Sequence, residues 1–362
     1  MARRRPARPR PLPARSRPLP ARFRPPPAWP RPLPPRSARW PWIALAVLPL
    51  SACSGSGQST LTPYGDGARR VAGLWWLMFG ISLFVTAVIV VLVLWAATRR
   101  RRPGVRARMD TGQRYVTITG IILPAIVLVL VYVISLPTLR AIGDPKDPDQ
   151  LTIDVLGHQW WWEVSYPGSG VVTANEIHMP TGRTVHLRLR TADVNHSFWA
   201  PQLNVKTDLV AGRTNHLWLR TDRPGVYRGQ CAEYCGLQHA RMAFHVVAQP
   251  PAEFAAWLTG QARPAPAPPG GLAAQGLRVL ESGSCASCHA VRGTTANGRI
   301  GPDLTHLASR RYLAAGTVPN TRGYLGGWIS NSQTIKPGNR MPPQPLASEQ
   351  LQALIAYLET LR

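Results

Sequence analysis

The sequence predicts a membrane-anchored, multi-domain protein: a two-helix transmembrane hairpin, then an all-β sandwich, then an all-α C-terminal domain. Two long uncharged apolar runs predict the hairpin, and short β-type runs broken by turn residues predict the sandwich. A Cys-x-x-Cys-His motif followed by an amphipathic helical pattern predicts the last domain. The chain has 362 residues, a length that suits two or three domains.

Residues 1–52 are predicted to be an Arg/Pro-rich head followed by a lipoprotein-type signal peptide. The first 40 residues hold 12 Arg, 13 Pro and no acidic residue, a composition that cannot bury enough apolar surface to fold. The apolar stretch 40–50 is too short to span a bilayer. It leads into Leu-Ser-Ala-Cys, which resembles a bacterial lipobox ending at Cys53. An ordinary leader with a chance cysteine, and a start codon further downstream, are the alternatives.

The net charge of +25 is typical of a nucleic-acid-binding protein, but its placement argues against that function. The head holds 12 of the excess positive charges, whereas residues 140–249 contain 11 basic and 10 acidic residues. Nucleic-acid recognition needs a basic stripe on a packed domain. We therefore expect no nucleic-acid partner.

Residues 71–139 are predicted to form the transmembrane hairpin. The runs Val71–Ala97 and Tyr115–Leu139 contain no charged residue, and each exceeds the roughly 20 residues that a spanning helix needs. Residues 99–114, between them, carry seven Arg and one acidic residue. The positive-inside rule places this loop in the cytoplasm. The chain is thus predicted to cross the bacterial cell (inner) membrane twice, in contact with lipid, with its C-terminal domains in the periplasm or outside the cell.

Residues 140–250 are predicted to form the all-β sandwich, because short β-type runs alternate there with Gly, Pro, Asn and Asp. No helical period of useful length interrupts them. The predicted strands are Leu151–Leu156, Gln159–Tyr166, Thr184–Leu189, His216–Leu219 and Ala243–Val247.

One loop of this domain concentrates soft metal ligands. Cys231, Cys235, His239 and Met242 lie within twelve residues, and thiolate, thioether and imidazole together suit copper. Two thiolates four residues apart can bridge two copper ions. A second imidazole must come from elsewhere, and His196 stands at a predicted strand end 35 residues before the loop.

The loop pattern Cys-x-Glu-x-Cys-x-x-x-His-x-x-Met resembles the CuA domain of cytochrome c oxidase subunit II, as do residues 157–162 and 195–199. This resemblance implies a cupredoxin-like sandwich that holds a binuclear copper centre, CuA. It implies that Cys231 and Cys235 are the bridging thiolates and that His196 and His239 are the terminal imidazoles. Met242 would be the weak axial thioether ligand.

The same resemblance implies two further roles. Glu233 would give its backbone carbonyl to the second copper, and its carboxylate would reach a Mg²⁺ or Mn²⁺ ion at the interface with the catalytic subunit. Trp160 corresponds to the aromatic residue through which family members take up an electron from cytochrome c. The alternative for Trp160 is packing in the core, with Trp162 on the same face of the strand and Trp161 on the other.

Cys285, Cys288 and His289 form the Cys-x-x-Cys-His motif of covalent haem c attachment. The two thiols would form thioethers to the haem, and the His would bind its iron. Met341 is the single methionine that follows, and Met with His closes the iron to other ligands, as an electron carrier requires. His306 is the alternative sixth ligand. Thioredoxin-like redox chemistry is a weaker interpretation, because no βαβ pattern surrounds the motif.

Residues 272–362 resemble an all-α class I cytochrome c domain, and residues 262–271 form a Pro-rich linker before it. The resemblance implies that Gly301 and Pro302 support His289. Apolar residues recur at helical spacing from 348 to 361, which predicts a C-terminal packing helix.

Hairpin, CuA domain and fused cytochrome c, in this order, resemble subunit II of a caa3-type oxidase. The resemblance implies an oxidoreductase subunit that passes electrons from an external donor, such as a cytochrome c or a quinol–cytochrome c reductase, through haem c and CuA to subunit I. Subunit I would reduce O₂ and pump protons, with subunit III as a further partner. Two alternatives stay open: the CuA subunit of a nitric oxide reductase, and a free periplasmic copper and haem carrier.

One position departs from the family pattern. Many members carry a Glu seven residues before the Pro of a Pro-Ala pair in the second helix, where it feeds a proton channel of subunit I. In this chain the pair begins at Pro124, and the corresponding residue is Thr117. We therefore expect protons to reach that channel through another residue.

Overall fold

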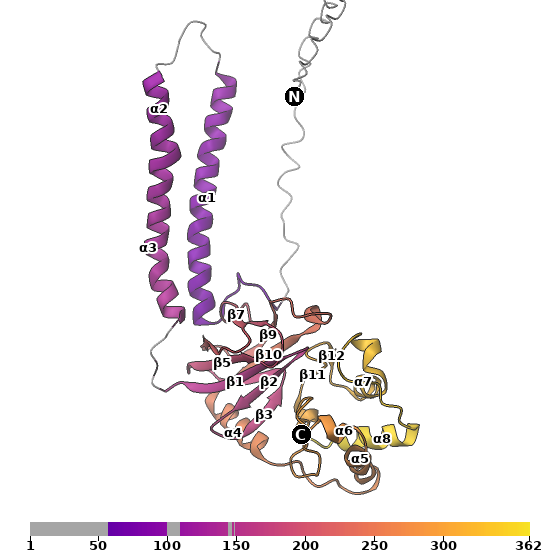
Figure 1. Cartoon of the computed structure of the whole chain (residues 1–362). Helices are drawn as coiled ribbons and strands as arrows, with labels where there is room; N and C mark the ends of the chain where they lie inside the picture. The colour runs from indigo at the N-terminus through magenta and orange to yellow at the C-terminus, as the bar shows by residue number, and fades with distance from the viewer. Residues whose placement is uncertain (1–56, 100–108, 144–146, 148) are drawn as a thin grey trace, which may run out of the picture. The chain divides into compact units, whose positions relative to one another are not determined.

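The computed structural model describes residues 57–99, 109–143, 147 and 149–362 (Figure 1). The predicted head, signal peptide and lipobox cysteine at residues 1–53 lie outside the described residues. The predicted order of a hairpin, an all-β domain and an all-α domain is confirmed.

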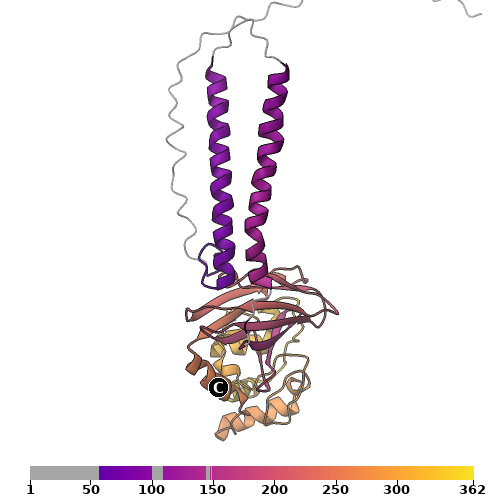
Figure 2. The same ribbon diagram turned by 90° about the vertical axis from the view of Figure 1, so that its left-hand side faces the viewer.

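Among the described residues, two helical segments are long and apolar enough to cross a membrane. The first is α1 (Asp66–Thr98). The second consists of α2 (Met109–Thr117), a π-helical turn (Ile118–Ile122) and α3 (Leu123–Gly143), and it runs alongside α1 in both views (Figures 1 and 2). The π-helical turn comes directly before Pro124, whose missing N–H cannot complete an ordinary α-helical ladder. The side chains of both spans are largely exposed, as expected of surfaces that lipid covers.

The β domain is a sandwich of two five-stranded sheets with strand orders β3-β2-β1-β5-β8 and β4-β10-β9-β6-β7. Most neighbouring strands are antiparallel, and β1 with β5 and β4 with β10 are parallel. The strands are β1 (Leu151–His158), β2 (Trp161–Tyr166), β3 (Val171–Ala174), β4 (Glu176–Pro180), β5 (Val185–Thr191), β6 (His196–Trp199), β7 (Thr207–Leu209), β8 (Asn215–Leu219), β9 (Gly225–Cys231) and β10 (Ala243–Gln249).

The five predicted strands correspond to β1, β2, β5, β8 and β10, and five further strands were not predicted. Three of these, β3, β6 and β7, have only three or four residues, too few to show an alternating pattern. The strand predicted from Gln159 begins at Trp161, because residues 159 and 160 form a turn. Trp160 and Trp162 are nevertheless both buried, and Trp161 is more exposed.

Aromatic and branched side chains from both sheets fill the interior of the sandwich. Trp162 packs against Phe198 and Phe244, with ring centroids 5.9 and 5.3 Å away. Helix α4 (Pro251–Ala262) adds Phe254 to this core and places Trp257 against it. The metal-ligand loop thus starts from strands that a large aromatic core holds in place.

The C-terminal domain is built from α5 (Gly271–Ser282), α6 (Cys285–Cys288), α7 (Arg322–Ile335) and α8 (Ser348–Leu358). Helices α5 and α8 pack closely at Gly276, where a Cβ atom would lie 1.9 Å from the carbonyl oxygen of Ala353. A two-stranded hairpin, β11 (Tyr312–Leu313) and β12 (Val318–Pro319), lies between α6 and α7 in the chain. A separate apolar cluster forms the core of this domain.

Candidate functional site

Five residues with sulfur or imidazole donors lie together in the β domain, near the start of strand β6 and the end of strand β9. His196 opens β6, Cys231 closes β9, and Cys235 lies in the loop that follows. A short 3-10 helix (His239–Arg241) then carries His239 and is followed directly by Met242. The predicted ligands thus come from two paired strands and the loop between β9 and β10.

The donor atoms lie close enough to bind metal. The two sulfurs of Cys231 and Cys235 are 3.8 Å apart. Cys231 Sγ lies 3.8 Å from His196 Nδ1, and Cys235 Sγ lies 3.6 Å from His239 Nδ1. Met242 Sδ is 3.8 Å from Cys235 Sγ. Two sulfurs between two imidazoles match the donor chemistry of a pair of copper ions.

The carbonyl oxygen of Glu233 also points into this cluster, 3.2 Å from Cys231 Sγ. The Glu233 side chain is exposed, so its backbone and its carboxylate face different surroundings. The backbone carbonyl of Glu233 thus lies toward the thiols, and its carboxylate lies toward the surface.

Residues outside the donor set hold the ligands in place. Asp193 Oδ1 lies 2.9 Å from His196 Nε2, which leaves Nδ1 directed at Cys231. The side-chain amide of Gln159 and the indole N–H of Trp160 both donate to the carbonyl oxygen of Cys235, at 2.8 and 2.9 Å. Burial alone would raise the pKa of Asp193, but hydrogen bonds from His196 and two backbone N–H groups outweigh it and lower that pKa.

The buried thiols influence each other's ionisation. The hydrogen bond from Cys235 lowers the pKa of Cys231, and the same contact raises the pKa of Cys235, because two adjacent thiolates repel each other. A cation between the sulfurs would remove that repulsion. The electrostatics of the pair therefore fit a metal centre.

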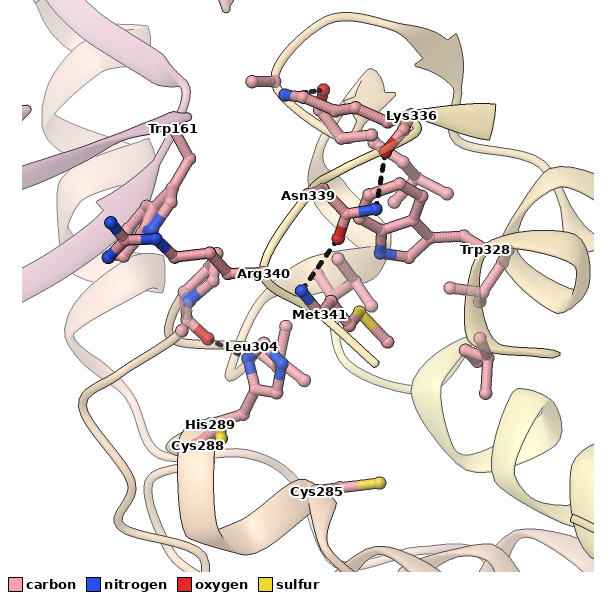
Figure 3. A pocket seen from close by; sticks show the side chains of 18 of the residues that line it. Trp161, Cys285, Cys288, His289, Leu304, Trp328, Lys336, Asn339, Arg340 and Met341 are labelled. Carbon is pink, nitrogen blue, oxygen red and sulfur yellow. Dashed lines mark hydrogen bonds between the residues drawn. The ribbon is translucent and has the colours of Figure 1, made fainter. Parts of the chain in front are cut away.

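The predicted haem residues Cys285, Cys288, His289 and Met341 line a cavity of about 270 Å³ (Figure 3). Part of its wall comes from the sandwich, through residues 158–161 and Asn175. His289 Nδ1 donates to the carbonyl oxygen of Pro302 at 2.7 Å. This bond leaves Nε2 as the available metal-binding nitrogen. A Cβ atom at position 301 would lie 2.6 Å from the His289 ring, which explains why glycine stands there.

The cavity suits an apolar macrocycle with acidic substituents. Its walls are mostly aliphatic and aromatic, and include Leu280, Leu304, Trp328 and Ile329. Arg310 also lines it, is 7% exposed, and has a buried Nε without a hydrogen-bond partner in the part of the chain that the structure describes. The carboxylates of Asp303 and Glu176 lie near this guanidinium, but its Nε still lacks an acceptor among the described residues. A haem with its propionates would fill the cavity and supply one.

The two predicted alternatives for the sixth iron ligand differ in position. Met341 lines the cavity across from His289 (Figure 3). His306 does not line it. The two ring nitrogens of His306 lie 2.7 and 3.1 Å from the carbonyl oxygens of Arg362 and Arg263. The geometry therefore favours Met341 and gives His306 a packing role.

Sequence analysis missed several residues that shape these sites. Asp193 stands three residues before His196, a spacing that could have indicated a supporting carboxylate. Arg310 and Lys336 carry no such signal, since only the folded chain shows that both are buried at the cavity.

Comparisons with known proteins identify the families of the two C-terminal domains. Residues 169–249 match the family "Cytochrome C oxidase subunit II, periplasmic domain", and residues 273–362 match the cytochrome c family. The chain is 36% identical to cytochrome c oxidase subunit 2 of Alkalihalophilus pseudofirmus, over 88% of this chain and 96% of that protein. The chain belongs to the cytochrome c oxidase subunit II family.

A second relative, cytochrome c oxidase subunit 2 of Bacillus subtilis, is 30% identical over 88% of this chain and 96% of that protein. The crystal structure of the periplasmic domain of oxidase subunit II (CoxB) of Bradyrhizobium japonicum is 31% identical. The match covers 32% of this chain and 95% of the CoxB chain, with a TM-score of 0.31. The two family domains imply copper in the sandwich and haem in the C-terminal domain.

Proposed function

We propose that this chain is the electron-input subunit of an aerobic terminal oxidase. Bound haem c and binuclear copper would supply the one-electron carriers between an external donor and the haem–copper subunit that reduces O₂ to water and pumps protons. The observation that carries the proposal is that one chain brings two thiols and two imidazoles together in the sandwich and lines a cavity with a haem attachment motif. Trp160 lines the cavity and also donates to the carbonyl of Cys235.

The chain's own residues would hold copper with little rearrangement. Cys231 and Cys235 would bridge two ions, and His196 and His239 would each bind one. Met242 and the Glu233 carbonyl would complete the set as weak ligands. Asp193 fixes the ring of His196 through its Nε2–H, a contact that keeps the other nitrogen available to metal.

The exposed Glu233 carboxylate would bind a Mg²⁺ or Mn²⁺ ion at the interface with the catalytic subunit. A carboxylate oxygen suits these hard cations. The other ligands of such an ion would have to come from the partner subunit or from water.

In the C-terminal domain, Cys285 and Cys288 would attach haem c through thioethers, and His289 and Met341 would bind its iron. The Pro302 carbonyl orients the His289 ring. With haem bound, the surrounding apolar side chains would limit its exposure to water. Low exposure and methionine ligation would both raise the haem's reduction potential.

Trp160 would pass electrons toward copper, since its indole N–H donates to the carbonyl of Cys235. This tryptophan is only 9% exposed, and the side chain of Lys336, from the haem domain, donates to its backbone oxygen at 2.9 Å. We therefore infer that Trp160 receives electrons from the chain's own haem domain and not from an external protein.

The proposed partners are subunit I, subunit III and an external donor such as a cytochrome c or a quinol–cytochrome c reductase. The proposed location is the bacterial inner membrane, with both C-terminal domains in the periplasm and lipid around the two apolar spans. Co-purification in mild detergent tests the assembly. A chain that purifies without a haem-bearing catalytic subunit would contradict it.

Metal analysis and electron paramagnetic resonance of the full-length chain test the two cofactors. We expect two coppers per covalently bound haem, with one unpaired electron shared between the coppers. One copper with a localised electron would mean that the second thiolate does not bridge, and would contradict the proposed site.

Thr117 allows a test of proton uptake. We expect Thr117→Val to change oxidase turnover by no more than about twofold, because the substitution removes no carboxylate. Steady-state O₂ consumption by the purified complex measures this. A strong loss of turnover would show that Thr117 itself serves the channel.

A further inference from the structure

The haem domain contacts the sandwich through two of its loops. At the tip of the β11–β12 hairpin, the carbonyl oxygen of Ala315 accepts the backbone N–H of Ala243 at 3.0 Å. The backbone N–H of Arg311, just before this hairpin, donates to the Glu176 carboxylate at 2.6 Å. In the second loop, which precedes Met341, the side chain of Arg340 bonds that of Gln159.

Lys336 lies at the centre of this contact and is 2% exposed. Its Nζ donates to two carbonyl oxygens, that of Trp160 in the sandwich at 2.9 Å and that of Ala314 in the hairpin at 3.1 Å. No carboxylate pairs with it among the described residues. A buried amine without a counter-ion is costly, and burial lowers the pKa of Lys336 to about 7. Its two hydrogen bonds therefore join its own loop to the hairpin and to the sandwich, and they offset part of the cost of burying the amine.

Hydrogen bonds extend from Lys336 toward both redox sites. On the haem side, Asn339 donates to the Lys336 carbonyl at 2.7 Å and accepts the backbone N–H of Met341 at 2.8 Å (Figure 3). On the copper side, Trp160 donates to the carbonyl of Cys235 at 2.9 Å. Lys336 thus links the loop that carries a predicted haem ligand to the tryptophan that contacts a predicted copper ligand. The side chains of Gln238 and Arg241 also donate to the carbonyls of Pro337 and Ile335 near the ends of this loop.

We propose that Lys336 is a positioning residue that fixes the spacing between the haem site at Met341 and the copper site at Cys235. The proposal rests on the proposed function. Lys336 itself carries no electron. It joins the hairpin tip, the Met341 loop and Trp160, so that the haem domain stays docked in one orientation despite the Pro-rich linker. Arg340 contributes less, because its side chain is exposed and its contacts with Gln159 and Asp193 are open to water and salt.

The test compares Lys336→Met with Arg322→Met in the purified, cofactor-loaded complex. Lys336→Met removes the charge and both hydrogen bonds at similar side-chain length. Arg322→Met is the matched control, because Arg322 bonds Glu359 and Gln352 within the haem domain. Two quantities are measured: the enhancement of copper spin relaxation by the nearby haem, which reports their separation, and the rate of electron transfer between them after rapid reduction of the haem.

For Lys336→Met we expect weaker relaxation enhancement and a transfer rate lower by severalfold, because electron tunnelling slows as the two sites move apart. Copper content and haem potential should match the unchanged chain, and Arg322→Met should behave like that chain. Unchanged relaxation and rate in Lys336→Met would overturn the proposal. Absence of a shared-electron copper signal from the unchanged chain would instead contradict the proposed function.

A second variant decides the matter if Lys336→Met does not retain haem. Gly316 follows the hairpin tip at φ 74°, and a Cβ atom there would lie 3.0 Å from Ala243 Cβ across the contact. Gly316→Val should push the hairpin away from the sandwich and weaken the relaxation enhancement in the same way. An unchanged enhancement would overturn the docked arrangement on which the role of Lys336 depends.

Discussion

The two redox sites of this chain are built in different ways. In the sandwich, His196 and both loop cysteines already lie with donor atoms within 4.8 Å of one another, and hydrogen bonds hold them there. In the C-terminal domain, His289 is oriented, but a cavity separates it from Met341. The β fold alone assembles the copper site, whereas the haem would itself form the centre of the helical domain's core.

The largest expected effect follows from that difference. A haem in the cavity would pack against Leu280 of α5 and Leu354 of α8, so the helical domain would lose part of its core without it. We expect the double substitution Cys285→Ala and Cys288→Ala, which prevents haem attachment, to abolish protection of α5 and α8 from amide hydrogen exchange.

The matched change in the sandwich is the double substitution Cys231→Ser and Cys235→Ser. It should abolish copper binding and leave exchange protection of β1 and β10 intact, because Trp162, Phe198 and Phe244 pack without copper. Equal loss of protection in both domains would refute the contrast between a site assembled by the fold and one assembled by its cofactor.

A smaller effect is expected from the residue that orients His196. Asp193→Ala should lower copper affinity by about 10- to 100-fold, the usual cost of losing a partner of a metal-binding imidazole. Competition with a copper chelator, followed by electron paramagnetic resonance, measures it. Asp193→Asn should restore part of the affinity, since its amide oxygen can still accept from Nε2. The exposed Asp222, which pairs with Arg220, provides the control Asp222→Ala, and an equal loss there would contradict the role of Asp193.

The contact between the two domains should depend on acid through Glu176. Burial alone would raise the pKa of this carboxyl, but hydrogen bonds from His178 and from the Arg311 N–H outweigh it and hold the pKa below 4.5. His245 and Arg310 also face it. The stabilisation is therefore complete above pH 4.5 and is lost as pH falls through the lowered pKa.

Hydrogen exchange of the Arg311 amide as a function of pH checks this prediction. Once the known pH dependence of chemical exchange is removed, the opening of the contact should increase below pH 4.5. Glu176→Gln should show no such increase, since its amide does not titrate in that range. The same acid response in both proteins would assign it to another group.

The residues of both candidate sites could be named from the sequence, because thiols and imidazoles at fixed spacing have few other uses, and the structure brings them together. The order of the domains could be predicted for a similar reason. Long uncharged runs and alternating strand patterns can each be read from a short stretch of sequence. Sequence reasoning missed β9, in which Gly225 and Gly229 interrupt the pattern. It could not place Arg310, Lys336 or Glu176 either, because their roles depend on a contact between surfaces far apart in the chain. A Pro-rich linker indicates separation along the chain and carries no information about docking.

Substitution of His306 is expected to have the smallest effect on the haem site. This test separates an iron ligand from a histidine that only packs. The His306 ring contacts the carbonyls of Arg362 and Arg263 and not the cavity. His306→Gln should leave the haem potential and the charge-transfer band of methionine-ligated haem unchanged, at a stability cost of about 1–3 kcal/mol for the buried carbonyl left unpaired. Met341→Ala, in contrast, should lower the potential, because methionine ligation raises it. Redox titration of both variants decides between the residues, and a shift in His306→Gln equal to that in Met341→Ala would reinstate the bis-histidine alternative.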